Sequence, residues 1–145
     1  MNIDGIQNGY VIDHITAGKA MTIYRYLGLD RLDCSVAIIK NAKSQRMGRK
    51  DIIKIDELIP IDLHILGYID PGVTVNVIRD ERLADKKHLA LPERVENVIR
   101  CKNPRCITQV EQEIEQVFVL ADRDKGTYRC LYCEAAHKPE DKPEY

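Results

Sequence analysis

A large net charge of either sign and long hydrophobic runs are both missing from the 145-residue sequence. Its 22 Lys and Arg residues balance 23 Asp and Glu residues, which leaves a formal net charge of -1. Nucleic-acid-binding proteins usually need a basic surface, so this balance weighs against that class. No run of about 18 apolar residues could cross a bilayer, and the start MNIDGIQNGY lacks both the basic and the apolar region of a signal peptide. We therefore expect a globular protein of the cytoplasm.

Motifs of common catalytic sites are missing as well. The sequence contains no P-loop and no GxGxxG loop. Asp13 and His14 are neighbours, but no serine or cysteine nucleophile accompanies them at a motif spacing. The sequence therefore gives no reason to expect an enzyme.

The first part of the chain predicts an α+β domain. Strands are expected at 11–15, 34–41, 49–58 and 73–80, where apolar and β-branched residues gather between turn signals. Helices are expected after Thr16, a plausible N-cap, as far as Gly28, and from Pro60 to Ile69. This order favours a ferredoxin-like antiparallel sheet with two helices on one face.

The pattern loses its period from Arg82 to about Pro92, and no regular element is expected there. We place a domain boundary near residues 92 to 96, with one domain at 1–93 and a second at 94–145. The tail from His137 is polar and rich in proline, so we expect it not to pack.

Only five cysteines are present, yet four of them form two close pairs, Cys101-x4-Cys106 and Cys130-x2-Cys133. A β-hairpin is expected between the pairs, which predicts a small all-β, zinc-ribbon-like domain with one tetrahedral structural zinc ion per chain. A thioredoxin-like redox pair at Cys130 and Cys133 is the alternative. The fifth cysteine, Cys34, is expected to be a buried small hydrophobe, and His137 a solvated residue of the tail.

A second candidate site lies in QRMGRKDIIKID, which carries Arg46, Arg49, Lys50 and Lys54. On a strand Lys50 and Lys54 point to one face, where their long side chains could converge on a phosphate-bearing ligand. The alternative is a solvated edge strand whose lysines prevent it from pairing with another chain. Simple alternation would place Asp13 and His14 on opposite faces of their strand, as ligand contacts or as structural residues.

The segments VIDHI, MGRKDIIKI, TVN, LPERVENVI and C-x4-C…C-x2-CE, in this order, resemble the regulatory chain of aspartate carbamoyltransferase from about Asp4 to Glu134. The resemblance implies a non-catalytic subunit whose N-terminal domain forms a homodimer and binds CTP or ATP, and UTP as a further candidate. It also implies a zinc domain that docks on the catalytic chain and transmits feedback control of pyrimidine biosynthesis. A zinc-ribbon nucleic-acid-binding protein is the alternative function.

The resemblance also implies site residues. Nucleotide contacts are expected at Ile6, Val11, Asp13, His14, Lys50, Ile52, Lys54, Asn76, Ile78 and Lys86. The expected zinc ligands are Cys101, Cys106, Cys130 and Cys133, and contacts with the catalytic chain are expected at Asn103 and Glu134. The backbone near Ile6 and Glu81 would read the exocyclic group of a pyrimidine. Arg105 stands where this family often has a second asparagine.

Overall fold

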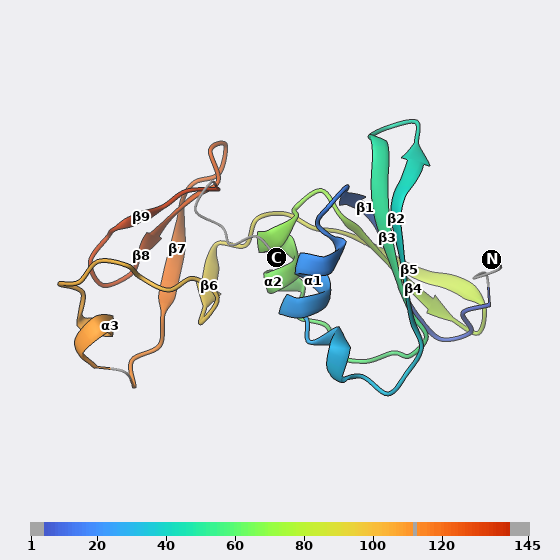
Figure 1. The fold of residues 1–145 in the computed structure, drawn as a ribbon, viewed down its shortest axis with the longest axis horizontal. Helices are drawn as coiled ribbons and strands as arrows, with labels where there is room; N and C mark the ends of the chain where they lie inside the picture. Colours follow the sequence, from blue (N-terminus) through green and yellow to red (C-terminus); the bar gives the residue numbers. More distant parts are fainter. Residues whose placement is uncertain (1–4, 112, 140–145) are drawn as a thin grey trace. The chain divides into compact units, whose positions relative to one another are not determined.

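A computed structural model describes residues 5–111 and 113–139 of the protein (Figure 1). Two compact units divide between Ala90 and Leu91, and each is described by itself. Among the described residues, no helix combines the length and the apolar character needed to cross a membrane.

The N-terminal unit is built on a five-stranded antiparallel sheet with the strand order β2-β3-β1-β4-β5. The strands are β1 (Gly9–Thr16), β2 (Val36–Ser44), β3 (Gly48–Ile55), β4 (Thr74–Arg79) and β5 (Arg82–His88). Two α-helices, α1 (Ala20–Tyr26) and α2 (Leu63–Ile69), lie on one side of the sheet, and a 3-10 turn, η1 (Leu29–Arg31), follows α1 (Figure 1).

The core of this unit lies between the sheet and the helices. Ile12 of the central strand pairs with Ile53 on one side and with Val75 on the other, and all three side chains are fully buried. Ile23 of α1 and Leu66 of α2 are also fully buried. The predicted α+β class, with two helices on one face of an antiparallel sheet, is confirmed.

Three local predictions were wrong. Helix α1 begins after Lys19 rather than Thr16, because the backbone N–H and the hydroxyl of Thr16 donate to the carboxylate of Asp70 instead. Helix α2 begins at Leu63, not near Pro60, since the side chain of Asp62 accepts from the first N–H groups of that helix. Strand β5 was not expected at all, because every one of its residues is exposed and no hydrophobic period marks it.

Simple alternation also fails within β1. A bulge interrupts the pairing of β1 with β3 between Ile12 and Ile15, and both of these residues are fully buried. His14, inside the bulge, has a φ of 59°, in the left-handed region. The prediction that Asp13 and His14 lie on opposite faces therefore does not hold, since it assumed a regular strand.

The C-terminal unit contains a four-stranded antiparallel sheet with the order β6-β7-β8-β9. Its elements are β6 (Arg94–Glu96), α3 (Ile107–Val110), β7 (Val117–Asp122), β8 (Thr127–Cys130) and β9 (Ala136–His137). Val95, Val117, Phe118 and Tyr128 form its small apolar core, and the hydroxyl of Tyr128 donates to the carbonyl oxygen of Pro92 at 2.6 Å. The predicted small all-β domain is confirmed, with one short helix added.

The start of the tail is packed, contrary to the prediction. His137 belongs to β9, and its half-buried ring lies edge-on to Phe118 with ring centroids 6.0 Å apart. The expectation of a solvated His137 was wrong because backbone pairing with Tyr128 holds the segment against the sheet. The rest of the predicted tail, residues 140–145, lies outside the described residues.

Candidate functional sites

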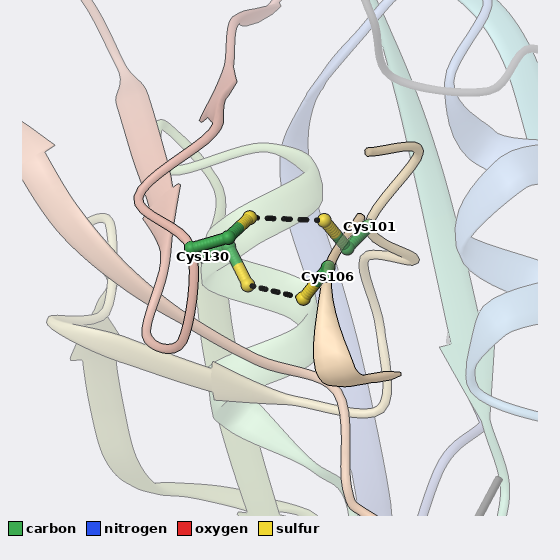
Figure 2. Close-up of side chains that lie close together, drawn as sticks. Cys101, Cys106 and Cys130 are labelled. Carbon is green, nitrogen blue, oxygen red and sulfur yellow. Dashed lines mark hydrogen bonds between the residues drawn. The ribbon is translucent and has the colours of Figure 1, made fainter. Parts of the chain in front are cut away.

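The four paired cysteines converge in the C-terminal unit. Their sulfur atoms all lie within 4.8 Å of one another. The sulfur of Cys101 is 3.5 Å from that of Cys133, and the sulfur of Cys106 is 3.7 Å from that of Cys130. Figure 2 shows the thiols of Cys101, Cys106 and Cys130 turned toward a common centre.

Two tight loops aim these thiols. In the first, the N–H of Cys106 donates to the carbonyl oxygen of Asn103 at 3.0 Å, immediately before α3. In the second, the N–H of Glu134 donates to the carbonyl oxygen of Cys130 at 2.9 Å, and Glu134 has a φ of 65°. Each pair of cysteines is therefore held by backbone geometry, as the close spacing in the sequence requires.

Polar side chains around the cluster fix the first pair. The hydroxyl of Thr108 donates to the sulfur of Cys106 at 3.1 Å. The N–H of Cys101 donates to the side-chain oxygen of Gln116 at 3.0 Å, and the side-chain amide of Gln109 donates to the carbonyl oxygen of Cys101. Such outer contacts orient metal ligands and tune their basicity.

The thiols differ in acidity. Burial raises the pKa of Cys101 to about 12 and also raises the pKa of Cys130. Burial acts in the same direction on Cys133. Hydrogen bonds from the backbone of Ala135 and the side chain of Asn103, with help from the thiols of Cys101 and Cys130, outweigh it and lower the pKa of Cys133 to about 7. Asn103, predicted to contact the catalytic chain, therefore supports a metal ligand as well.

The geometry fits a tetrahedral metal ion. Metal–sulfur bonds of about 2.3 Å place tetrahedral sulfur atoms about 3.8 Å apart, close to the distances within this cluster. All four predicted ligands are brought together, which disfavours a redox pair made of Cys130 and Cys133 alone. A shell of four thiolates is closed, so such an ion shapes the domain and leaves no position for a substrate.

The fifth cysteine differs from its prediction. Cys34 is half-buried rather than buried, and it precedes β2. Burial, with Glu57 nearby as a further cause, raises the pKa of its thiol.

In the N-terminal unit, four of the predicted nucleotide contacts form one row across the sheet. Val11 of β1 pairs with Lys54 of β3 on one side and with Asn76 of β4 on the other, and Asn76 pairs with Lys86 of β5. Residues paired across antiparallel strands point to the same face. The row lies on the face opposite the buried Ile12, because Val11 and Ile12 are consecutive residues of a strand.

Asp13, His14 and Lys50 form a polar cluster beside this row. A nitrogen–oxygen distance of 3.0 Å joins the ammonium of Lys50 to the carboxylate of Asp13. Burial works against ionisation of Asp13, but the hydrogen bonds from Lys50 and from the N–H of His14 outweigh it and lower its pKa. The ring of His14 lies 3.2 Å from the hydroxyl of Thr74.

An open pocket of about 240 Å³ adjoins one end of the row. Ile6 and Lys54, both predicted nucleotide contacts, line it together with Gly5, Asp56 and the first residues of β2. The other predicted contacts lie outside its lining: Ile52 pairs with Ile39 of β2, and Ile78 pairs with Gly9 of β1.

The backbone position expected to read a base is already engaged in part. The N–H of Glu81 donates to the carbonyl oxygen of Gln7 at 2.9 Å, and Glu81 has a φ of 65°. Lys86 lies on the fully exposed edge strand β5.

One structurally important residue was missed. Asp51 of β3 is fully buried and accepts hydrogen bonds from the backbone N–H groups of Gly18, Ala20 and Asn41. The period of β3 could have revealed it, because Asp51 shares the buried face with Ile53 and Ile55.

Together these features define a class of protein. An α+β domain carries a row of polar and cationic side chains on its open face, and a separate small domain is organised by a closed four-cysteine cluster. A closed cluster of this kind is typical of a chain whose metal ion is structural, not of an enzyme that uses its metal ion for chemistry.

Comparisons with known proteins identify the family. The family described as aspartate carbamoyltransferase regulatory chain, allosteric domain, matches residues 1–90, and the family described as its metal binding domain matches residues 93–142. Chains named aspartate carbamoyltransferase regulatory chain are similar over nearly their whole length. The relative from Clostridium botulinum is 49% identical over 141 residues, 97% of each chain. The relative from Bifidobacterium longum is 43% identical over 138 residues, 95% of this chain and 99% of that one.

The chain therefore belongs to the family of aspartate carbamoyltransferase regulatory chains, and it is a regulatory rather than a catalytic chain. The resemblance inferred from the sequence is confirmed. An allosteric domain comes first, and a metal-binding domain follows it.

Proposed function

We propose that the N-terminal domain, at residues 1–93, is an allosteric receptor for nucleoside triphosphates, with CTP and ATP as effectors and UTP as a further candidate. The row from Lys54 through Val11 and Asn76 to Lys86 is the observation that carries this proposal. The row has a lysine at each end, and between them lie the amide of Asn76 and the apolar side chain of Val11. A triphosphate needs several positive charges, and a base and ribose need apolar contact and hydrogen-bonding groups.

Ile6, Ile52 and Ile78 add apolar surface in this proposal, while Asp13 and His14 supply the contacts to ribose and phosphate. The ammonium of Lys50 is paired with the carboxylate of Asp13. A phosphate group would compete with that carboxylate for Lys50, so we expect the pair to rearrange when a nucleotide binds.

The C-terminal domain, at residues 94–145, holds one structural zinc ion in this proposal. Four thiolates in a tetrahedral arrangement suit zinc, and iron is the common competitor for such a set. Metal analysis of the purified chain should find about one zinc ion per chain, tightly held. A stoichiometric iron content instead would contradict the assignment.

We further propose that the zinc domain docks on the catalytic chain of aspartate carbamoyltransferase in the cytoplasm. Four large apolar side chains are exposed within four residues of a cluster cysteine: Ile107, Val110, Leu131 and Tyr132. Exposed apolar groups at a rigid loop are typical of interaction surfaces. Asn103 and Glu134 would add polar contacts, and Arg105 would alter the pattern usual in this family.

The N-terminal domain is proposed to form a homodimer, for which the edge strand β2 offers unpaired backbone groups. CTP and ATP would compete for one site and favour different states of the complex. Each shifts the equilibrium by its differential affinity, about 1 to 3 kcal/mol in typical allosteric systems. The chain would thus convey feedback control of pyrimidine biosynthesis.

Calorimetric titration of CTP into the metal-loaded chain tests the nucleotide site. Lys54→Ala and Lys86→Ala should each weaken binding about 10- to 100-fold, as expected for lost hydrogen bonds to a charged group. Lys87→Ala is the matched control, because Lys87 pairs with the buried Val75 and so lies on the other face of the sheet. Equal affinities in all three variants, or no binding of millimolar CTP, would contradict the proposal.

The regulatory role is tested with the catalytic chain present. CTP should change substrate saturation only when this chain is part of the complex. An equal CTP effect on the isolated catalytic chain would exclude the role. The nucleic-acid-binding alternative predicts steeply salt-dependent binding to DNA or RNA, and the family assignment does not favour it.

A further inference from the structure

One cavity is lined entirely by residues of the C-terminal unit, none of which belongs to the proposed nucleotide site. Its volume is about 510 Å³, within the usual range of small-molecule sites. Three cationic side chains, Lys125, Arg129 and Lys138, line it with a single acidic one, Asp122.

The floor of this cavity is the outer face of β7, β8 and β9. Tyr128 and Cys130 of β8 are buried on the inner face, so the alternate residues Thr127 and Arg129 point outward. Arg129 pairs with Ala136 of β9, a small residue that leaves room above the sheet. A hydroxyl, a guanidinium and small side chains therefore share one concave surface.

The walls of the cavity are fixed by local contacts. A guanidinium nitrogen of Arg129 donates to the carbonyl oxygen of Glu134 at 3.0 Å, which anchors the side chain. At the turn, Gly126 has a φ of 66°, and a Cβ there would lie 3.0 Å from the ring of Pro139. Glycine at position 126 therefore allows Pro139, which lines the cavity, to pack closely over the turn.

The acid in the lining is already engaged. The carboxylate of Asp122 accepts the backbone N–H of Lys125 at 3.1 Å, so it serves the turn between β7 and β8. Among the described residues that line the cavity, three side chains are cationic and one is acidic, although the chain as a whole has a formal net charge of -1. This local excess needs an explanation that composition does not give.

We propose that this cavity binds a small phosphate-bearing anion, at a site separate from the effector nucleotide site. Lysine ammonium groups act as point charges toward phosphate, and the arginine guanidinium can bind two of its oxygens at once. The hydroxyl of Thr127 is a further donor at the floor. A lone carboxylate has only two oxygens for these donors, whereas a phosphate or pyrophosphate group can engage all of them. The site thus gives the metal-binding domain a ligand of its own.

Titration with inorganic pyrophosphate, followed by amide NMR of the full metal-loaded chain, tests this proposal. Saturable shifts are expected at the amides of Lys125, Thr127 and Arg129, and they resolve this site from any binding at the N-terminal lysines. Lys125→Gln should weaken these shifts about three- to tenfold, and Lys125→Arg should restore the affinity. Lys102→Gln removes an exposed lysine outside the lining and should change nothing.

Lys86→Ala separates the two proposals. It should leave the pyrophosphate shifts in the C-terminal unit unchanged even if it abolishes CTP binding. Shifts confined to the N-terminal unit would overturn the anion site, and so would an affinity that is the same in Lys125→Gln as in the unaltered chain. Binding of an acidic peptide but not of millimolar pyrophosphate would also overturn it, in favour of a protein-docking surface.

Discussion

Asp51 is the buried acid of β3, and we expect its replacement by alanine to destabilise the N-terminal unit strongly. One carboxylate oxygen accepts the N–H groups of Gly18 and Ala20, at 2.9 and 3.2 Å. The other accepts the N–H of Asn41 at 2.9 Å. Asp51 thereby ties β3 to the entry of α1 and to the bulged part of β2.

The cost of Asp51→Ala can be worked from these three bonds. The amide of Ala20 is buried and would lose its partner outright, at about 1 to 3 kcal/mol. Gly18 and Asn41 are exposed residues whose amides can recover water, so each loses about 1 kcal/mol. The sum predicts a loss of about 3 to 5 kcal/mol in the free energy of unfolding, a large part of the stability of a small domain.

Asp51→Asn sharpens the test because it keeps the size of the side chain and one acceptor oxygen. If that oxygen keeps the amides of Gly18 and Ala20, the new NH2 group faces the N–H of Asn41, donor against donor. One bond is then lost, and we expect a cost of about 1 to 3 kcal/mol. The predicted order of destabilisation is therefore alanine, then asparagine, then an exposed control such as Asp33→Asn.

Urea unfolding of the metal-loaded chain, followed by circular dichroism, measures the cost, and hydrogen exchange locates it. The amides of Ala20 and Asn41 should lose protection in Asp51→Ala before the rest of the sheet does. An Asp51→Ala variant that unfolds within about 0.5 kcal/mol of Asp33→Asn would refute the reasoning. So would unchanged protection of both amides.

Three further predictions concern the metal cluster and one tight approach of strands. Cys106→Ser should lower the metal content and unfold the C-terminal domain, whereas the control Cys34→Ser should keep a full complement of metal. Metal analysis and circular dichroism of both variants measure these effects. Metal affinity should rise with pH, by about tenfold per pH unit for each thiol that must give up a proton. The thiol of Cys101 must give up a proton to bind the metal, because burial raises its pKa to about 12. Competition with a chelator at several pH values measures the metal affinity. Gly9→Ala would place a Cβ 2.0 Å from a backbone carbonyl oxygen of β3, so it should destabilise the sheet by more than about 2 kcal/mol in urea unfolding. The control Gly5→Ala should be nearly neutral, because a Cβ there would have no neighbour within 4 Å.

The sequence was most informative where a residue type must recur at a fixed spacing. Ile53 and Ile55 alternate with Lys54, so the pattern of β3 showed both a core face and a polar face. The cysteine spacing was sufficient to predict the convergence of four thiols, because two short loops leave few other arrangements. Strand β5 could not be predicted in this way, since its backbone pairs with β4 while its side chains face solvent.

Local irregularities were invisible for a different reason. The bulge in β1 depends on how β3 and β4 hold that strand, and no residue type in VIDHI requires it. The engagement of Thr16 by Asp70 joins residues that are 54 positions apart in the chain. A pattern read along a short window cannot contain such a contact, and so the helix start was misplaced by three residues.

The alternation in β3 separates stability from ligand recognition. Asp51, Ile53 and Ile55 point into the core, where a change affects the folding of the whole N-terminal unit. Lys50 and Lys54 point to the other face, where they contribute little to the core. Substitution of Lys54 should therefore change the affinity for an anionic ligand more than the free energy of unfolding, whereas substitution of Lys50 also removes the ion pair with Asp13. The opposite result, loss of stability with affinity preserved, would mean that the polar face of β3 exists to hold the sheet together and not to bind an effector.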